Sequence, residues 1–354
     1  MERRQQLGTK VQRFRTLPIP PVEINKTAVK PGPKAKGPSE NRILLRTMYG
    51  IGDTLFQVPL IKEIARHYEN VWVHTIFPEA LWEMPQNVHL IPTSCAIRTQ
   101  RKYIAARQSK DWYEPKLFSN AQCPGGTKKV GLRYKARDII DKDYTVFDSF
   151  MHHMRLADVK FDEGRPLDFS LSIRQPWADA ARRLRRRIGL VGKFAIVRSV
   201  TYRKECMFLQ RNCDHDHLQT AVDHLNLRGI PVIEVADVDG KMEFFVKDKL
   251  QNIHTHFIRG EIDLPVLMAL VDQATVTVTP TGMMYHIGQI LRSQMVVLFG
   301  GMHSNKYFEH PSFSTPSVRC ILPEPFCNCW LSNCNSCNKY IPKEIICSAI
   351  DEKL

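Results

Sequence analysis

Short apolar runs alternate with stretches of helical spacing along most of the chain. The run at 43–45 predicts a buried strand, and apolar residues at 60, 61, 64 and 65 repeat at helical spacing beyond Pro59. Residues 70–78, 87–92 and 144–150 predict further strands. Short strands that alternate with helices indicate βαβ units, so we predict an α/β protein with a parallel sheet.

The alternation begins again after Lys193. We predict helices at about 214–228 and at 241–250, 264–274 and 283–292, and strands at 194–200, 229–237, 253–260, 275–280 and 294–301. These units would form a second doubly wound sheet. Two such sheets would give two Rossmann-like domains that face a central cleft.

Composition divides the chain into four segments. Residues 1–40 are rich in Pro and Lys, which indicates a flexible basic tail, either a solvated leader or an arm for an anionic acceptor. We assign 41–180 to an N-terminal domain, 181–325 to a C-terminal domain, and 326–354 to a Cys-rich segment with a C-terminal helix. A polar, basic stretch at 100–137 has no clear period, so we expect an inserted loop there.

The chain is basic, with a formal net charge of +14. A surplus of this size predicts an anionic partner such as a nucleotide, a phosphorylated glycolipid or nucleic acid. No apolar run approaches the roughly 18 residues that a membrane span needs. The basic start also lacks the apolar core of a signal peptide, so we expect a cytoplasmic protein.

One carboxylate, Asp53, follows Gly50 and Gly52 where a strand gives way to a helix. These glycines do not form a dinucleotide fingerprint, because the third glycine is missing. Asp53 and Thr54 are short polar residues, so a helix cap is the simplest interpretation. Pro59 favours a helix that begins near it, which would leave Asp53 free to face a ligand at the strand end.

Two clusters in the second half suit an anion. The first follows a strand and contains Arg198, Thr201, Arg203 and Lys204, which fit a diphosphate, although surface charge is the alternative. The second, 279–291, is a strand, a glycine turn and a helix, which together aim backbone N–H groups at an anion. His286 in that helix is either a core residue or a ligand contact, and its spacing favours the core.

Four cysteines lie close together in the sequence: Cys327, Cys329, Cys334 and Cys337. The second pair has zinc-knuckle spacing, whereas the Cys-x-Cys spacing of the first is less usual. We keep two alternatives, a structural zinc site and reduced thiols in a loop. A closed four-sulfur site would have no open position for catalysis, so zinc would only hold the C-terminal segment in place.

The order of several motifs resembles glycosyltransferase family nine, the lipopolysaccharide heptosyltransferases. These motifs are the Asp53 element, "VTYRKE", "FIRGEIDLPVLMALVDQA", "PTGMMYH", "VVLFGG" and "CNCWLSNCNSCNKYIPKEII". The resemblance spans residues 42–350 and is nearest to divergent phage or environmental members. It implies a GT-B fold, with an acceptor-binding N-terminal domain and a donor-binding C-terminal domain around the cleft.

The resemblance also implies roles for single residues. Asp53 would be the general base of an inverting displacement that requires no cofactor, and Gly50, Gly52 and Thr54 would face the acceptor. The donor-binding residues would be Arg198, Thr201, Arg203, Lys204, Thr281, Gly282 and His286, with Glu243 at the ribose and Ile262 and Leu264 beside the base.

Core family members carry Asp-Thr-Gly or Glu-Gly-Gly where this chain has Pro280, Thr281, Gly282 and Met283. An acidic side chain is therefore missing, and the resemblance does not identify the sugar or the nucleotide. Three functions follow: sugar transfer to lipopolysaccharide or another glycan, sugar transfer to a hydroxymethylated base in DNA, and nucleic-acid binding without catalysis. The basic charge suits a DNA acceptor. Asp53 and the Arg203–Lys204 pair argue against the non-catalytic function.

Overall fold

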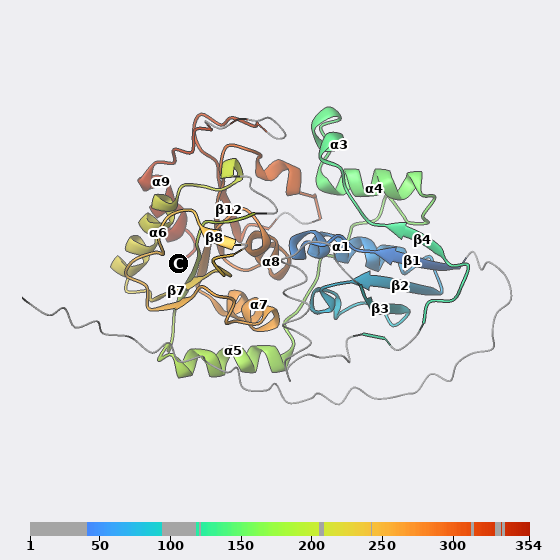
Figure 1. The fold of residues 1–354 in the computed structure, drawn as a ribbon, viewed down its shortest axis with the longest axis horizontal. Helices are drawn as coiled ribbons and strands as arrows, with labels where there is room; N and C mark the ends of the chain where they lie inside the picture. Colours follow the sequence, from blue (N-terminus) through green and yellow to red (C-terminus); the bar gives the residue numbers. More distant parts are fainter. Residues whose placement is uncertain are drawn as a thin grey trace, which may run out of the picture.

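The computed structural model describes residues 41–93, 118–119, 122–204, 209–241, 243–312, 315–329, 334 and 337–354. The predicted tail at 1–40 lies outside these residues, as do residues 100–117, 120 and 121 of the predicted loop at 100–137. The described remainder of that range contains a strand, Lys128–Gly131, and the start of a helix, Ala136–Asp141, so it is more regular than predicted. The described chain forms two parallel sheets that lie side by side, each covered by helices (Figure 1).

The first sheet is built from residues before 132. Among the described residues its order is β3-β2-β1-β4, and every pair is parallel. The strands are β1 (Arg42–Arg46), β2 (Asn70–Thr75), β3 (Val88–Pro92) and β4 (Lys128–Gly131). Ile43 and Leu45 of β1 are fully buried, as expected for a strand with helices or chain on both faces. This part also contains α1 (Ile51–Ile64), η1 (Pro78–Leu81), α3 (Ala136–Asp141) and α4 (Val146–Leu156).

The second sheet has the order β12-β11-β10-β5-β7-β9 in the described part of the chain. Its strands are β5 (Ala195–Arg198), β7 (Val232–Val235), β9 (Thr255–Phe257), β10 (Val276–Pro280), β11 (Met295–Leu298) and β12 (Val318–Ile321). Its helices are α6 (His215–Leu227), α7 (Leu264–Gln273), α8 (Met283–Leu291) and α9 (Lys343–Asp351). This order confirms the predicted second doubly wound sheet.

Smaller elements decorate the second sheet. The strands β6 (Thr201–Arg203) and β8 (Glu243–Phe245) pair with each other and form a two-stranded antiparallel ribbon. Two short 3-10 helices are η3 (Leu209–Arg211) and η4 (Asn305–Phe308). The long helix α5 (Gln175–Arg187) packs on α7 along the lower edge of the view, and the predicted domain boundary at 180 falls inside it (Figure 1).

Three sequence predictions were wrong. The predicted strand at 144–150 is the start of α4, because Thr145 and Asp148 form a capping box that begins a helix. The predicted helix at 241–250 contains β8 instead, which pairs with β6. The helix expected to begin near Pro59 begins at Ile51, and Pro59 lies inside it.

The two sheets are joined through α1 and α8, which lie against each other between them (Figure 1). The ring of Phe56 on α1 lies 4.3 Å from the ring of His286 on α8 and 5.9 Å from that of Phe308. These residues belong to one continuous apolar core that extends into both halves. Within the described ranges, the helices are all too short or too polar to cross a membrane.

Candidate active site

Asp53 lies in the first turn of α1, at the carboxyl edge of the first sheet. Its side chain is partly exposed, and the Tyr134 hydroxyl donates a hydrogen bond to Asp53 Oδ1 over 3.1 Å. Tyr134 follows β4, which runs parallel to β1, so both residues emerge at the same edge of the sheet. The prediction that Asp53 precedes the helix was therefore wrong, but the carboxylate still stands at the expected sheet edge.

The surroundings of Asp53 make it a stronger base than an ordinary carboxylate. Burial raises the pKa of Asp53, while the Tyr134 hydrogen bond and the positive charges of Arg211 and Arg203 lower it by less. A carboxylate accepts a proton more readily as its pKa rises toward the working pH. The site thus combines a basic carboxylate with two nearby cations.

The glycines beside Asp53 provide space for side chains of the protein. A methyl group at Gly50 would lie 2.3 Å from Asp53 Oδ2, and one at Gly52 would lie 2.4 Å from His286 Cδ2. Thr54 is buried, and its hydroxyl donates to the Gly50 carbonyl over 2.9 Å. Local packing accounts for all three residues, and their predicted contact with an acceptor stays a prediction.

The four residues of the first predicted anion cluster lie in the ribbon or beside it. Glu243 Oε1 accepts hydrogen bonds from Thr201 Oγ1 over 2.7 Å and from Arg198 Nη2 over 3.4 Å. Arg203 stands opposite Glu243 in the ribbon, and the Lys204 ammonium lies 5.1 Å from the centre of the Phe244 ring. The carboxylate predicted to contact a ribose therefore also holds two of the predicted donor-binding residues.

Arg211 on η3 lies beside the turn that begins α8, and the sequence analysis missed it. Its backbone oxygen accepts a hydrogen bond from Thr281 Oγ1 over 3.1 Å, and its Nη2 donates to the Thr281 carbonyl over 3.4 Å. Gly282, at the N-terminus of α8, has φ +142° and ψ −153°, a conformation that is essentially restricted to glycine. A methyl group there would approach Arg211 Nη2 to 2.9 Å.

His286 packs among aromatic rings between the two sheets. Its side chain is buried, its Nδ1 lies 3.2 Å from Gln289 Oε1, and the rings of Phe56, Tyr285 and Phe308 surround it. Burial lowers the pKa of His286 to about 3, so the imidazole is neutral at physiological pH. The structure favours the core alternative for this residue.

The remaining predicted residues lie at two other places. Ile262 and Leu264 flank Asp263, the residue that precedes α7, with Leu264 buried and Ile262 partly exposed. The sulfur atoms of the four clustered cysteines all lie within 4.8 Å of one another, so this cluster could hold a metal ion.

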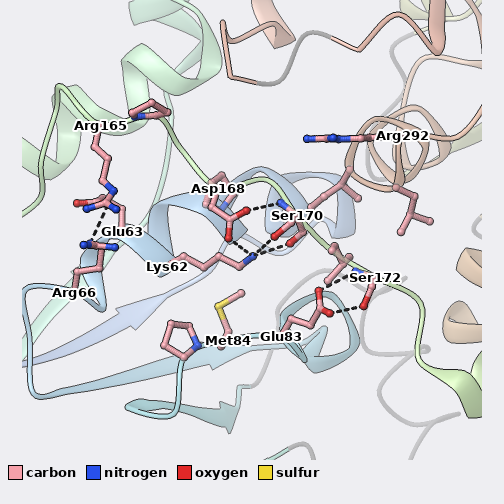
Figure 2. Close-up of a pocket in the computed structure, with 16 residues that line it drawn as sticks. Lys62, Glu63, Arg66, Glu83, Met84, Arg165, Asp168, Ser170, Ser172 and Arg292 are labelled. Carbon is pink, nitrogen blue, oxygen red and sulfur yellow. Dashed lines mark hydrogen bonds and ion pairs between the residues drawn. The ribbon is translucent and has the colours of Figure 1, made fainter.

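A cavity of about 1020 Å³ lies at the other end of α1 (Figure 2). Lys62 crosses it and donates to Asp168 Oδ2 over 2.8 Å and to the Ser170 carbonyl over 2.7 Å, and the Ser172 amide donates to Glu83 over 2.8 Å. Many of its polar groups thus pair with each other. Since Asp53 does not line this cavity, we place the candidate active site at the N-terminal end of α1 instead.

Solved structures of similar fold cover most of the chain. They include a glycosyl transferase of family 9 from Veillonella parvula (13% identity, TM-score 0.54, 88% of this chain and 97% of that one). They also include ADP-heptose LPS heptosyltransferase II from E. coli (14% identity, TM-score 0.55, 88% and 98%). A third is the iron-containing dodecameric glycosyltransferase TibC from enterotoxigenic E. coli (12% identity, TM-score 0.55, 88% and 76%).

No protein-family profile matches the sequence, and no curated protein sequence matches it. At identities this low, similarity of structure establishes the fold rather than the reaction. The fold predicted from the order of the motifs is confirmed. The chain has the two-domain GT-B architecture that these glycosyltransferases share.

Proposed function

We propose that the protein is an inverting glycosyltransferase that moves a sugar from a nucleoside-diphosphate sugar to a hydroxyl group of an anionic acceptor. The observation that carries the proposal is Asp53, a carboxylate whose pKa is raised by burial and whose neighbours are Tyr134, Arg203 and Arg211. Two further features support it: Asp53 lies in the first turn of α1, after β1, and two cations that follow β5 and β6, Arg203 and Arg211, act on its pKa.

In this reaction Asp53 takes the proton of the acceptor hydroxyl. The acceptor oxygen then bonds to the anomeric carbon while the bond from that carbon to the diphosphate oxygen breaks, so the configuration inverts. Tyr134 holds the carboxylate in position through its hydrogen bond to Oδ1. The raised pKa makes the Asp53 carboxylate a stronger base, which favours transfer of the proton to it.

The departing nucleoside diphosphate requires stabilisation of its negative charge. The positive charges of Arg203 and Arg211 lower the pKa of Asp53, and we assign these two cations to the departing diphosphate. The first amides of α8, after the extended Gly282, are available to phosphate oxygens at a helix N-terminus. Oriented cations and amides of this kind stabilise developing charge without a metal ion.

The acceptor carries negative charge in this proposal because the chain has a net charge of +14. A glycolipid with phosphate groups is the first candidate, as the E. coli neighbour is an LPS heptosyltransferase. A DNA base is the second candidate, favoured by the same charge. Binding to DNA should weaken steeply with salt, because each phosphate contact releases a counterion.

A transfer assay tests the proposal. Nucleoside-diphosphate sugars, including ADP-heptose, are incubated with lipopolysaccharide core acceptor or with hydroxymethylated DNA. Released diphosphate and product mass are then measured. We expect turnover with one donor and acceptor pair, the opposite anomeric configuration in the product, and loss of turnover in Asp53→Asn. Turnover retained in Asp53→Asn, or a retained configuration, would refute the assigned mechanism.

A further inference from the structure

The four clustered cysteines form a compact group outside the proposed active site. Their sulfur atoms are separated by 2.9 Å (Cys329–Cys337), 3.4 Å (Cys334–Cys337) and 3.8 Å (Cys327–Cys334). Four sulfurs bound tetrahedrally at about 2.3 Å from one zinc ion would lie about 3.8 Å apart. Small shifts would therefore place all four around a single ion.

We propose that Cys327, Cys329, Cys334 and Cys337 bind one zinc ion, and that this ion positions Arg211 for the donor diphosphate. The first part depends only on the cysteines, and the second rests on the proposed function. A disulfide needs sulfur atoms about 2.0 Å apart. Cys337 instead lies within 3.4 Å of both Cys329 and Cys334, which suits a shared ion better than a pairwise bond.

The cysteine cluster is packed tightly against the chain that follows β11. A methyl group at Gly301 would lie 2.8 Å from Cys337 Cβ, so only glycine lets the cluster approach this closely. The Cys329 amide donates to the Gly301 carbonyl over 3.4 Å. The same stretch then connects to η3, because the Gly300 amide donates to the Arg211 carbonyl over 3.1 Å.

A second connection runs from the cluster to η3 directly. Gln210 Nε2 donates to the Cys334 carbonyl over 2.6 Å, and the Met302 amide donates to the Gln210 carbonyl over 3.2 Å. Lys339, two residues beyond Cys337, donates from Nζ to the Leu209 carbonyl over 2.8 Å. All three residues of η3 thus form hydrogen bonds with the cysteine segment or with residues 300–302, against which the cluster packs. An ion that fixes the cysteines would also fix the backbone of Arg211.

The metal content of the purified protein tests the first part. Mass spectrometry of the metals in protein prepared without chelator, and again after incubation with zinc chloride, should give about one zinc ion per chain. Cys337→Ser should lose the ion, whereas Cys347→Ser on α9, outside the cluster, should keep it. No bound zinc in either preparation, or equal zinc in Cys337→Ser, would overturn the site. Iron in place of zinc would overturn the assigned metal.

Amide exchange and diphosphate binding test the second part. Loss of the ion should speed exchange at Gly300 and Met302, whose amides hold η3. It should also weaken nucleoside-diphosphate binding about tenfold, within the usual range for coupled sites. The double variant Cys337→Ser/Arg211→Ala should bind the nucleoside diphosphate with nearly the same affinity as Arg211→Ala alone, because the ion would act through Arg211. Unchanged exchange and affinity in Cys337→Ser would refute the positioning role.

The proposed function can fail separately. If the wild-type chain binds none of the nucleoside diphosphates tested, the glycosyltransferase proposal fails, while zinc content and amide exchange still decide the metal site. If diphosphates bind but zinc does not, only the metal site fails.

Discussion

Replacing Tyr134 with Phe should move the pH dependence of sugar transfer in a direction fixed by the site. The hydroxyl donates to Asp53 Oδ1 over 3.1 Å, and this hydrogen bond lowers the pKa of Asp53 against the larger effect of burial. Without it, the pKa of Asp53 rises further. The acidic limb of the profile, where Asp53 becomes protonated, should therefore shift to higher pH.

The size of the shift follows from the hydrogen bond. A hydrogen bond to a charged group contributes about 1.5–3 kcal/mol, and about 1.36 kcal/mol of difference between the two protonation states is one pKa unit. Because Asp53 is partly exposed and water replaces some of the loss, we expect the lower end, a shift of about one pH unit. On the acidic limb this is a rate about tenfold lower than that of the wild type.

The assay is kcat/KM for diphosphate release, measured from pH 4.5 to 8.5 with the donor and acceptor that turn over. Phe should keep the packing of the Tyr134 ring, which lies edge-on to Phe150 with 5.5 Å between ring centres. Tyr340→Phe, at a residue 62% exposed, is the control and should leave the profile unchanged. An acidic limb that stays in place or moves to lower pH in Tyr134→Phe would refute the reasoning about Asp53.

Four further outcomes are expected. Gly50→Ala should abolish transfer with little change in unfolding temperature, because its methyl group would displace the flexible Asp53 carboxylate. Gly52→Ala should instead lower the unfolding temperature, because its methyl group meets the buried His286 ring. Thermal melts and activity assays that show the two effects reversed would contradict this. Asp53→Asn should unfold at the same or a higher temperature at pH 7. The reason is that the raised pKa of Asp53 makes its ionised form destabilising to the folded state as pH rises, and Asn does not ionise. A lower melting temperature for Asp53→Asn than for the wild type would argue against the raised pKa. His286 and His303, with pKa values lowered to about 3, stay neutral in the folded protein but become protonated when it unfolds below about pH 6.5. Denaturant titrations should therefore show the free energy of unfolding falling as pH drops from 6.5 toward 3, by up to about 1.4 kcal/mol per pH unit for each histidine. A smaller fall in His286→Gln would support this, and the same fall as in the wild type would contradict it. Glu243→Gln should weaken diphosphate binding, because Arg198 and Thr201 lose a charged partner; titration calorimetry showing tighter binding would be the contrary result.

Most of the second sheet could be predicted because its strands are buried on both faces. Thr277 and Val278 of β10 and Val296 and Val297 of β11 are fully buried, so the sequence shows short β-branched runs between helices. Where the local pattern was weak, the prediction failed. Residues 144–150 are rich in aromatic and β-branched side chains, but the capping box at Thr145 starts a helix there.

The candidate site, too, could be predicted from the sequence only in part. Asp53 was predictable because it stands at the junction of a strand and a helix. Tyr134 was not, because β4 is only four residues long and carries two exposed lysines; a recognised β4 would have placed Tyr134 at the same sheet edge. Arg211 has no sequence signal, since only the fold of η3 against Thr281 brings it to the site.

Binding of nucleoside diphosphates tests the central claim most directly. Titration calorimetry with the diphosphates ADP, UDP, GDP and TDP, and with the monophosphate CMP, compares the wild type with Arg211→Ala and with a control. The control is Arg228→Ala, whose side chain pairs with Asp351 on α9. The account predicts that one diphosphate binds and that Arg211→Ala, but not Arg228→Ala, weakens it at least tenfold, as expected for a lost charge-assisted contact of about 1.5–3 kcal/mol. Binding of none of these nucleotides, or equal affinity in Arg211→Ala and the wild type, would contradict it.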